Sequence, residues 1–130
     1  MCLYIGTKYS FANTLGNPNS KGLLSAYKIF KVVGNEFRSP FRRKTWKHGW
    51  NKSNRKTEKL TQNEISTGYV DFGFHMFKTI EEAKEDLAEF KENRKYIIRK
   101  VYFRRENVVA TGGFNGKISI VTSRLFTRFD

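Results

Sequence analysis

A single stretch of this chain has the pattern of a long amphipathic helix, and this restricts what the rest can form. Thr79 is followed three residues later by Glu82, which is the spacing of a capping box. Apolar residues then recur at three- and four-residue steps: Ile80, Ala83, Leu87 and Phe90. Acidic residues fill the first turn and the opposite side. We expect a helix that starts at Thr79, ends near Asn93 and packs its apolar side on a core.

The other patterned segments have the composition of β-strands. Four runs are rich in β-branched and aromatic residues or alternate apolar with polar side chains: Tyr27–Val33, Tyr69–Phe77, Tyr96–Phe103 and Lys117–Thr122. Asn115-Gly116 is a strong turn signal and predicts a hairpin between Val108–Thr111 and the last of these runs. The sequence therefore predicts an α+β fold, with a mostly antiparallel sheet of about five strands and one amphipathic helix packed on it.

Length and composition agree with one small domain. The 130 residues include 12 Phe, 6 Tyr and 2 Trp, which bury enough area each for a compact core. No stretch approaches the roughly 20 apolar residues of a membrane span, and the first ten residues lack a signal-peptide pattern. The one cysteine, Cys2, cannot form an internal disulfide, as is usual in a reducing cytoplasm. We expect one cytoplasmic domain, residues 1–130, with its core in residues 22–41 and 68–130.

The net charge of +13 is divided unevenly along the chain. Arg38–Lys59 holds nine basic residues and one acid, and Arg94–Arg105 holds six basic residues and no acid. Glu81–Glu92, in contrast, holds six acids and two lysines, which we interpret as the solvated side of the helix. The two basic blocks have no such structural explanation, and they predict a polyanionic partner.

The segment 42–67 lacks the period of a helix or a strand, and we expect a basic loop or insertion there. In and just before it, cations are interleaved with two tryptophans, and these residues form the predicted nucleic-acid-binding set: Arg38, Arg42, Arg43, Lys44, Trp46, Lys47, Trp50, Lys52, Arg55 and Lys56. Cations neutralise phosphates, and exposed aromatic rings stack on bases. The alternative is a solvated loop whose two tryptophans fill the edge of the core.

A second set of residues is a candidate ligand pocket: Tyr27, Lys28, His75, Arg99 and Lys100. The run Tyr96–Phe103 has a charged residue on each face, so it forms either an edge strand kept soluble by charge or the wall of a phosphate cleft. His75 shares a strand face with Asp71, and it is either a hydrogen-bonded structural histidine or a ligand contact.

Other chemistry has little support in the sequence. With only Cys2, His48 and His75 as soft or imidazole ligands, no zinc-type cluster is present, and we expect no metal and no cofactor. If Met1 is removed, the Cys2 thiol beside its own α-amine is a possible nucleophile. No phosphate-binding glycine loop, nucleophile elbow or paired-carboxylate site is present in the sequence.

Several short motifs resemble a family of small, uncharacterised proteins of phages and prophages. They are Met1-Cys2-Leu3, Ala26-Tyr27-Lys28 leading to Ser39-Pro40-Phe41, Gly73-Phe74-His75-Met76-Phe77 followed by Ala83, and the ending from Ala110-Thr111 to Ile118-Ser119-Ile120. The family has a Pro-Lys-Gly-Thr turn where this chain has Arg104-Arg105-Glu106-Asn107. The chain also resembles the ADP-ribosyltransferase fold, and that resemblance implies a site at Tyr27 or Lys28, His75 and Glu106.

These observations lead to one leading hypothesis and two alternatives. We expect a non-enzymatic binder of nucleic acid or of a phosphorylated nucleotide, and the phage resemblance implies an accessory role against a host defence ribonucleoprotein. One alternative is a nucleotide-pocket protein, either sequestering a signal nucleotide or acting as an ADP-ribosyltransferase-like enzyme. The other is an inhibitor that binds a host protein through the basic segment or the Glu81–Glu92 face.

Overall fold

The structure is a computed structural model of the chain, and it describes residues 3–5, 15–39, 45–90, 95–114 and 116–128. Eleven strands form one antiparallel sheet: β1 (Leu3–Tyr4), β2 (Leu24–Val33), β3 (Glu36–Arg38), β4 (Thr45–Trp46), β5 (Gly49–Lys52), β6 (Tyr69–Val70), β7 (Phe74–Phe77), β8 (Tyr96–Phe103), β9 (Val108–Phe114), β10 (Lys117–Thr122) and β11 (Arg124–Thr127). The helices that the described ranges contain in full are α2 (Gln62–Thr67) and α3 (Ile80–Leu87), with a 3-10 turn η2 (Arg105–Asn107). The mostly antiparallel sheet is confirmed, whereas the expected five strands and single helix are too few.

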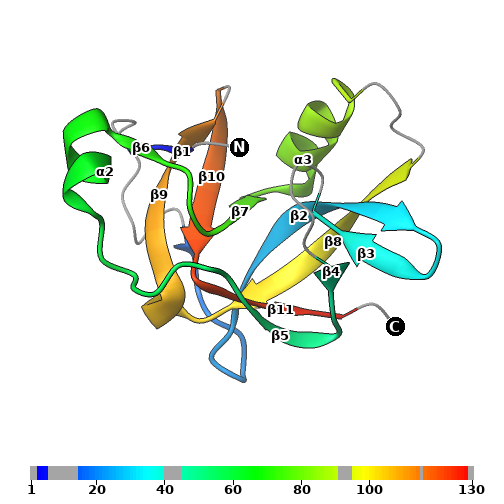
Figure 1. Cartoon of the computed structure of the whole chain (residues 1–130). Helices are drawn as coiled ribbons and strands as arrows, with labels where there is room; N and C mark the ends of the chain where they lie inside the picture. Colours follow the sequence, from blue (N-terminus) through cyan, green and yellow to red (C-terminus); the bar gives the residue numbers. More distant parts are fainter. Residues whose placement is uncertain (1–2, 6–14, 40–44, 91–94, 115, 129–130) are drawn as a thin grey trace.

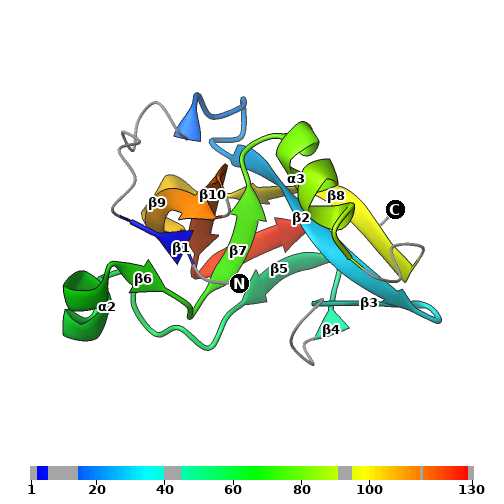
Figure 2. The same ribbon diagram turned by 90° about the horizontal axis from the view of Figure 1, so that it is seen from above.

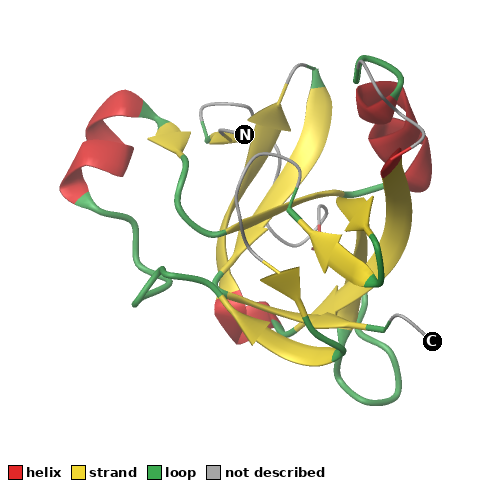
Figure 3. Ribbon diagram, turned by 45° about the vertical axis from the view of Figure 1, so that its right-hand side comes forward, coloured by secondary structure: helices red, strands yellow, loops and turns green. Residues whose placement is uncertain are grey.

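The strand order is β5-β11-β8-β2-β7-β10-β9-β1-β6, with β3 paired to β2 and β4 paired to β3. The sheet curls strongly, and α2 and α3 lie at opposite ends of it (Figures 1 and 2). Figure 3 shows both helices at the periphery of the curled strands. The inside of the curl is therefore the place for the main core.

Strand β2 separates two apolar clusters because its side chains alternate between the two faces of the sheet. It pairs with β8 over eight residues, from Leu24 opposite Phe103 to Lys31 opposite Tyr96. The inner side contributes Ala26 and Phe30 to the main core, together with Trp46, Phe74, Met76, Val101 and Phe103. The outer side carries Ile29, which packs with Phe77 and Ala83 of α3 in a second cluster. Helix α3 thus covers one part of the outer face.

Helix α3 confirms the predicted start and corrects the predicted end. Thr79 is the N-cap, and its hydroxyl accepts a hydrogen bond from the Glu82 backbone N–H at 3.2 Å. The helix ends at Leu87 instead of near Asn93. Its acids are not all in solvent, because Glu82 accepts a hydrogen bond from the Ile118 N–H and Asp86 is buried. That burial raises the pKa of the Asp86 carboxyl.

The expected loop at 42–67 is wrong for its described part, which contains β4, β5 and α2. Strands of two and four residues are too short to show a period in the sequence. Helix α2 begins with a reciprocal capping box, in which the Glu64 N–H donates to Thr61 Oγ1 at 3.1 Å and the Thr61 N–H donates to Glu64 Oε1 at 2.8 Å. It ends at Gly68, whose φ of 78° is left-handed.

The expected continuous strand Tyr69–Phe77 is broken into β6 and β7 by a bend. In a continuous strand Phe72 would share a face with Phe74 and Met76, but it lies in the bend and is 60% exposed. Gly73 has a φ of 127°, and a Cβ there would lie 2.6 Å from Val121 Cγ1, so only glycine fits. The predicted hairpin is confirmed as β9 and β10.

Candidate nucleic-acid interface

Three aromatic side chains form a row across neighbouring strands on the outer face of the sheet. Phe126 of β11 lies opposite Trp50 of β5 on one side and opposite Tyr102 of β8 on the other. Its ring centroid is 5.4 Å from that of Trp50 and 6.5 Å from that of Tyr102. Their sequence neighbours Leu125 and Val101 point into the main core, so the row faces away from it. All three rings are half-buried.

Basic side chains flank the aromatic row on both sides, because residues two positions along a strand return to the same face. They are Lys52, Arg124 and Arg104 on one side and His48, Arg128 and Lys100 on the other, and all are exposed. Lys52 and Arg124 are direct cross-strand partners. They place two positive charges side by side on the face, which favours an anionic ligand there. We refer to the row and these six flanking residues as the aromatic–basic face.

Two buried polar side chains hold the turn that carries this face. Asn51 Nδ2 donates to the carbonyl oxygen of Lys47 at 2.9 Å and to Thr127 Oγ1 at 3.1 Å. Thr127 Oγ1 donates to the same Lys47 carbonyl at 2.6 Å. Gly49 completes the turn with a φ of 101°. The position of Trp50, between Gly49 and Asn51, is therefore fixed without a ligand.

A pocket of about 340 Å³ lies at one end of the face and is lined by Trp50, Arg104, Glu106, Asn107 and Arg124. The Arg104 guanidinium carbon lies 5.3 Å from the centre of the Trp50 ring, at cation–π distance. Glu58 holds the lining residue Asn107 in place, because Asn107 Nδ2 donates to Glu58 Oε1 at 3.3 Å. Ser123 Oγ donates to the same oxygen at 2.7 Å. These hydrogen bonds, that of Ser123 above all, lower the pKa of Glu58.

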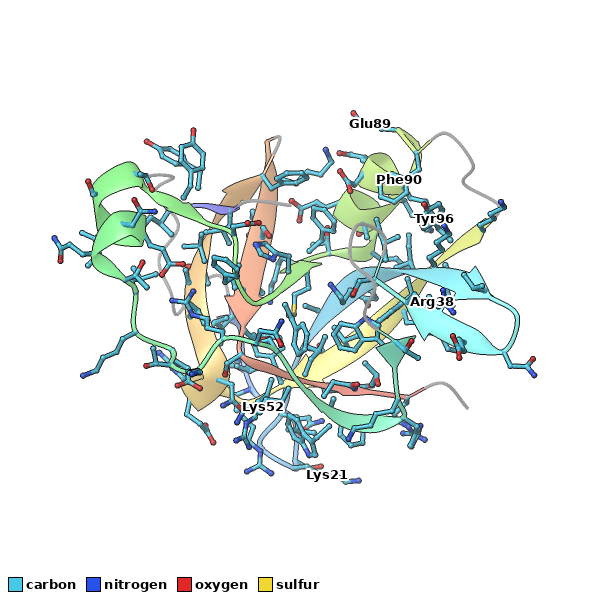
Figure 4. The ribbon with its side chains drawn as sticks, in the orientation of Figure 1. Lys21, Arg38, Lys52, Glu89, Phe90 and Tyr96 are labelled. Atoms are coloured by element: carbon cyan, nitrogen blue, oxygen red, sulfur yellow. The ribbon has the colours of Figure 1, made fainter. Side chains whose placement is uncertain are left out.

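Lys52 of the aromatic–basic face and Glu89, which follows α3, lie at opposite ends of the molecule. Figure 4 shows Lys52 and Lys21 at the lower end and Glu89 beside Phe90 and Tyr96 at the upper end, near α3. Phe90 and Tyr96 pack edge to face, with ring centroids 4.8 Å apart. A polyanion bound beside Lys52 is therefore distant from the Glu89 carboxylate.

The predicted role of Trp46 as a stacking residue is wrong. Trp46 is 4% exposed and lies in the main core, where its ring centroid is 4.4 Å from that of Phe74 and 5.3 Å from that of Phe30. Its indole N–H donates to Ser39 Oγ at 2.8 Å, so the buried nitrogen has a partner. Trp46 corresponds to the alternative interpretation, in which a tryptophan fills the core.

The predicted role of Arg55 as a phosphate ligand is also wrong, because all five guanidinium N–H donors have partners. Nη1 and Nη2 each donate to one oxygen of the buried Glu64 carboxylate at 2.7 Å. The other donors reach the carbonyl oxygens of Thr57, Lys59 and Phe72. The Arg55 hydrogen bonds lower the pKa of Glu64 to about 2. Arg55 thus holds the segment between β5 and β7 together.

The other members of the predicted nucleic-acid set fall in three groups. Trp50 and Lys52 belong to the aromatic–basic face, and Lys47 and Lys56 are exposed. Arg38 forms an exposed ion pair with Glu36 at 2.7 Å. Three residues, Arg42, Arg43 and Lys44, lie outside the described residues, as does Cys2.

The predicted ligand pocket does not form, because its residues are divided between the faces of the sheet. Lys28 lies opposite Arg99 on the inner side, and Tyr27 lies opposite Lys100 on the outer side. Lys28 is buried, and its Nζ donates to the His75 carbonyl oxygen at 2.7 Å and lies 5.4 Å from the Trp46 ring centre. Lys28 therefore has a structural role, because its Nζ binds a strand carbonyl and lies over a tryptophan of the main core.

His75 corresponds to the structural interpretation. It is 6% exposed, and its Nε2 lies 3.0 Å from the Val70 carbonyl oxygen, which requires the nitrogen to carry the proton. Burial lowers the pKa of the imidazole to about 4, so His75 is neutral at pH 7. A neutral ring bound to a carbonyl cannot attract a phosphate.

Sequence reasoning missed most of the aromatic–basic face, including Tyr102, Arg104, Arg124, Phe126 and Arg128. Two signals were available: the basic block Arg94–Arg105, and the alternation Arg124, Phe126, Arg128 near the end of the chain. The second identifies a strand with one apolar and one basic-aromatic side. Neither signal shows that the two strands are neighbours.

Comparisons with protein-family models, with curated proteins and with solved structures found no match for this chain. The resemblances to a phage family and to the ADP-ribosyltransferase fold, with the anti-defence role, stay predictions. Over the described ranges, no helix is long and apolar enough to cross a membrane. In the same part of the chain, no three His, Cys, Asp or Glu side chains gather as a metal site.

Proposed function

We propose that this protein binds single-stranded nucleic acid on its aromatic–basic face. The observation that supports this most strongly is the row Trp50, Phe126 and Tyr102 on three neighbouring strands, with cations on both sides. Aromatic rings on a sheet stack with unpaired bases, and flanking Lys and Arg neutralise the phosphates. A face with both features can bind the bases and the phosphates of the same nucleic-acid strand.

The geometry favours a single strand over a duplex. Base faces are accessible for stacking only when the bases are unpaired, and a duplex hides them inside its own stack. Neighbouring strands lie about 4.8 Å apart, so the row spans about 10 Å, which is room for two or three bases. The like-charged pair Lys52 and Arg124 is positioned for the backbone beside them.

Fluorescence anisotropy with a labelled oligothymidine of about 12 nucleotides tests the proposal. We expect binding that weakens steeply between about 50 mM and 200 mM salt. Trp50→Ala should weaken binding by about 1–3 kcal/mol, the range for one stacked base. The double variant Lys52→Gln/Lys100→Gln, which changes two exposed cations outside the pocket at the end of the face, should lower the salt slope by about 1.4, since each phosphate contact on a single strand contributes about 0.7.

Matched controls separate the face from general effects of the substitutions. Tyr69→Ala removes an aromatic ring that is 53% exposed on β6, and Lys84→Gln removes an exposed charge on α3. Neither should change the affinity for the oligonucleotide beyond measurement error. Equal affinity of the wild type and Trp50→Ala, or stronger binding of a duplex than of the single strand, would contradict the proposal.

A further inference from the structure

The pocket at the end of the aromatic–basic face is equipped to recognise one type of base. We propose that it accepts a guanine of the bound strand, with the Glu106 carboxylate accepting hydrogen bonds from the Watson–Crick edge of that base. The inference rests on the proposed function. Its first support is that the pocket combines a stacking surface, Trp50 with Arg104, and two residues with acceptor oxygens, Glu106 and Asn107.

Glu106 is an acceptor that no described residue of the protein engages. It lies in the middle of the turn η2, is exposed, and lines the same pocket as Arg104 and Arg124. Even so, among the described residues its carboxylate makes no hydrogen bond and no ion pair. A carboxylate close to two arginines is usually engaged by one of them. Here its oxygens are available to a ligand.

Asn107 adds a second acceptor whose orientation is set by the protein. Its amide Nδ2 donates to Glu58 Oε1 at 3.3 Å, and Glu58 is in turn held by Ser123. The amide nitrogen of Asn107 is therefore the atom that binds Glu58. Its amide oxygen, Oδ1, accepts no hydrogen bond from any described residue. The pocket therefore offers acceptors to the ligand through Glu106 and Asn107, and cations at its border.

Guanine is the base whose edge fits a carboxylate best. Its N1–H and N2–H₂ groups are adjacent donors, which match the two oxygens of one carboxylate. Adenine and cytosine present a single amino group beside an acceptor nitrogen, and thymine presents one N–H between two carbonyls. A carboxylate oxygen of Glu106 beside those carbonyl oxygens or ring nitrogens would be repelled, because these atoms carry partial negative charge. The O6 acceptor of guanine is complementary to arginine donors such as Arg124.

The size of the pocket suits one nucleotide. Its volume of about 340 Å³ is at the lower end of the roughly 300–1,000 Å³ found for ligand sites. The base can stack on the Trp50 ring or on the Arg104 guanidinium plane, since both surfaces serve as platforms for bases. The remaining nucleotides of the strand would continue along Phe126 and Tyr102.

The test compares oligothymidine with the same oligonucleotide carrying one central guanine, inosine, adenine or cytosine. We expect guanine to raise the affinity about tenfold, and inosine, which lacks the N2 amino group, to lose most of that gain. Glu106→Gln should remove the preference, so that this variant binds the guanine and the all-thymidine oligonucleotides equally. Glu85→Gln, which changes an exposed acid of α3, should retain the preference.

The outcomes distinguish this inference from the function on which it rests. Equal affinities for all oligonucleotides, with weaker binding by Trp50→Ala, would overturn the guanine pocket and leave the single-strand face intact. No binding of any oligonucleotide would refute the proposed function itself. Stabilisation by guanosine monophosphate in a thermal-shift assay without strand binding would overturn the inference in favour of a free nucleotide as ligand.

Discussion

Replacing Glu64 with alanine removes half of an ion pair that the fold keeps away from water. The side chains of Arg55 and Glu64 are 5% and 7% exposed, and Arg55 Nη2 lies 2.7 Å from Glu64 Oε1. The alanine variant leaves a buried guanidinium with carbonyl partners only, and breaking a buried pair in this way costs about 3–5 kcal/mol. The substitution also opens the capping box of α2, because the Thr61 N–H loses its acceptor.

The chain contains a natural control for this prediction. Arg38 and Glu36 form a pair with the same 2.7 Å separation, but their side chains are 43% and 49% exposed. Glu36→Ala should therefore cost less than about 1 kcal/mol. Urea unfolding followed by circular dichroism measures both variants. With an m-value of about 2 kcal/mol/M, the midpoint should fall by about 2 M for Glu64→Ala and by less than about 0.5 M for Glu36→Ala. Equal losses in the two variants would refute the reasoning that burial decides the contribution.

Three further predictions concern titration and fluorescence. The Arg55 hydrogen bonds lower the pKa of Glu64 from 4.5 to about 2, so their stabilisation is present above pH 4.5 and is lost as the pH falls towards 2. Acid unfolding of Glu64→Gln should lack this component. Burial lowers the pKa of His75 from 6.5 to about 4. Between these pH values the imidazole is protonated in the unfolded state and neutral in the folded state, so the free energy of unfolding decreases as the pH falls from 6.5 to 4. An NMR titration of the folded protein should give a His75 midpoint near 4, and a midpoint near 6.5 would contradict the buried geometry. Acrylamide should quench the half-buried Trp50 in a Trp46→Phe variant much more than the buried Trp46 in a Trp50→Phe variant, and similar quenching would be inconsistent with the fold.

The features that local sequence determines were predictable. The capping residue Thr79 and the apolar side of α3 follow from three- and four-residue spacing, and the β9–β10 hairpin follows from Asn115-Gly116. The alternation within Tyr96–Phe103, which predicts a charged residue on each face, also agrees with the structure, where Lys100 and Arg99 lie on opposite faces. In each case the information lies within a few residues of the feature itself.

The two tryptophans show what local sequence does not contain. Trp46 and Trp50 lie four residues apart in the same basic segment, yet one is in the core and the other is on the outer face. The difference comes from their strand partners, since Trp46 pairs with Phe37 whereas Trp50 pairs with Phe126, 76 residues further along the chain. Pairing at such separation sets which face is buried, and a single sequence does not reveal it.

The same segment also contained a signal that could have been used. Thr61 and Glu64 have the capping-box spacing that correctly identified the start of α3, and they mark the start of α2. Helix α2 has six residues, which is too short for an apolar period, so the cap is its main local signature. What no local signal indicates is that Glu64 also binds Arg55, and this ion pair removes Arg55 from the predicted phosphate ligands.

Photo-crosslinking to a bromodeoxyuridine-substituted single strand, followed by peptide mass spectrometry, tests the proposed binding face most directly. The molecule has aromatic side chains exposed elsewhere, at Tyr4, Tyr69 and Phe72, and these serve as internal competitors. We expect crosslinks on peptides that contain Trp50, Tyr102 or Phe126. Crosslinks confined to Tyr4, Tyr69 and Phe72 would contradict the assignment of the aromatic–basic face as the surface that binds nucleic acid.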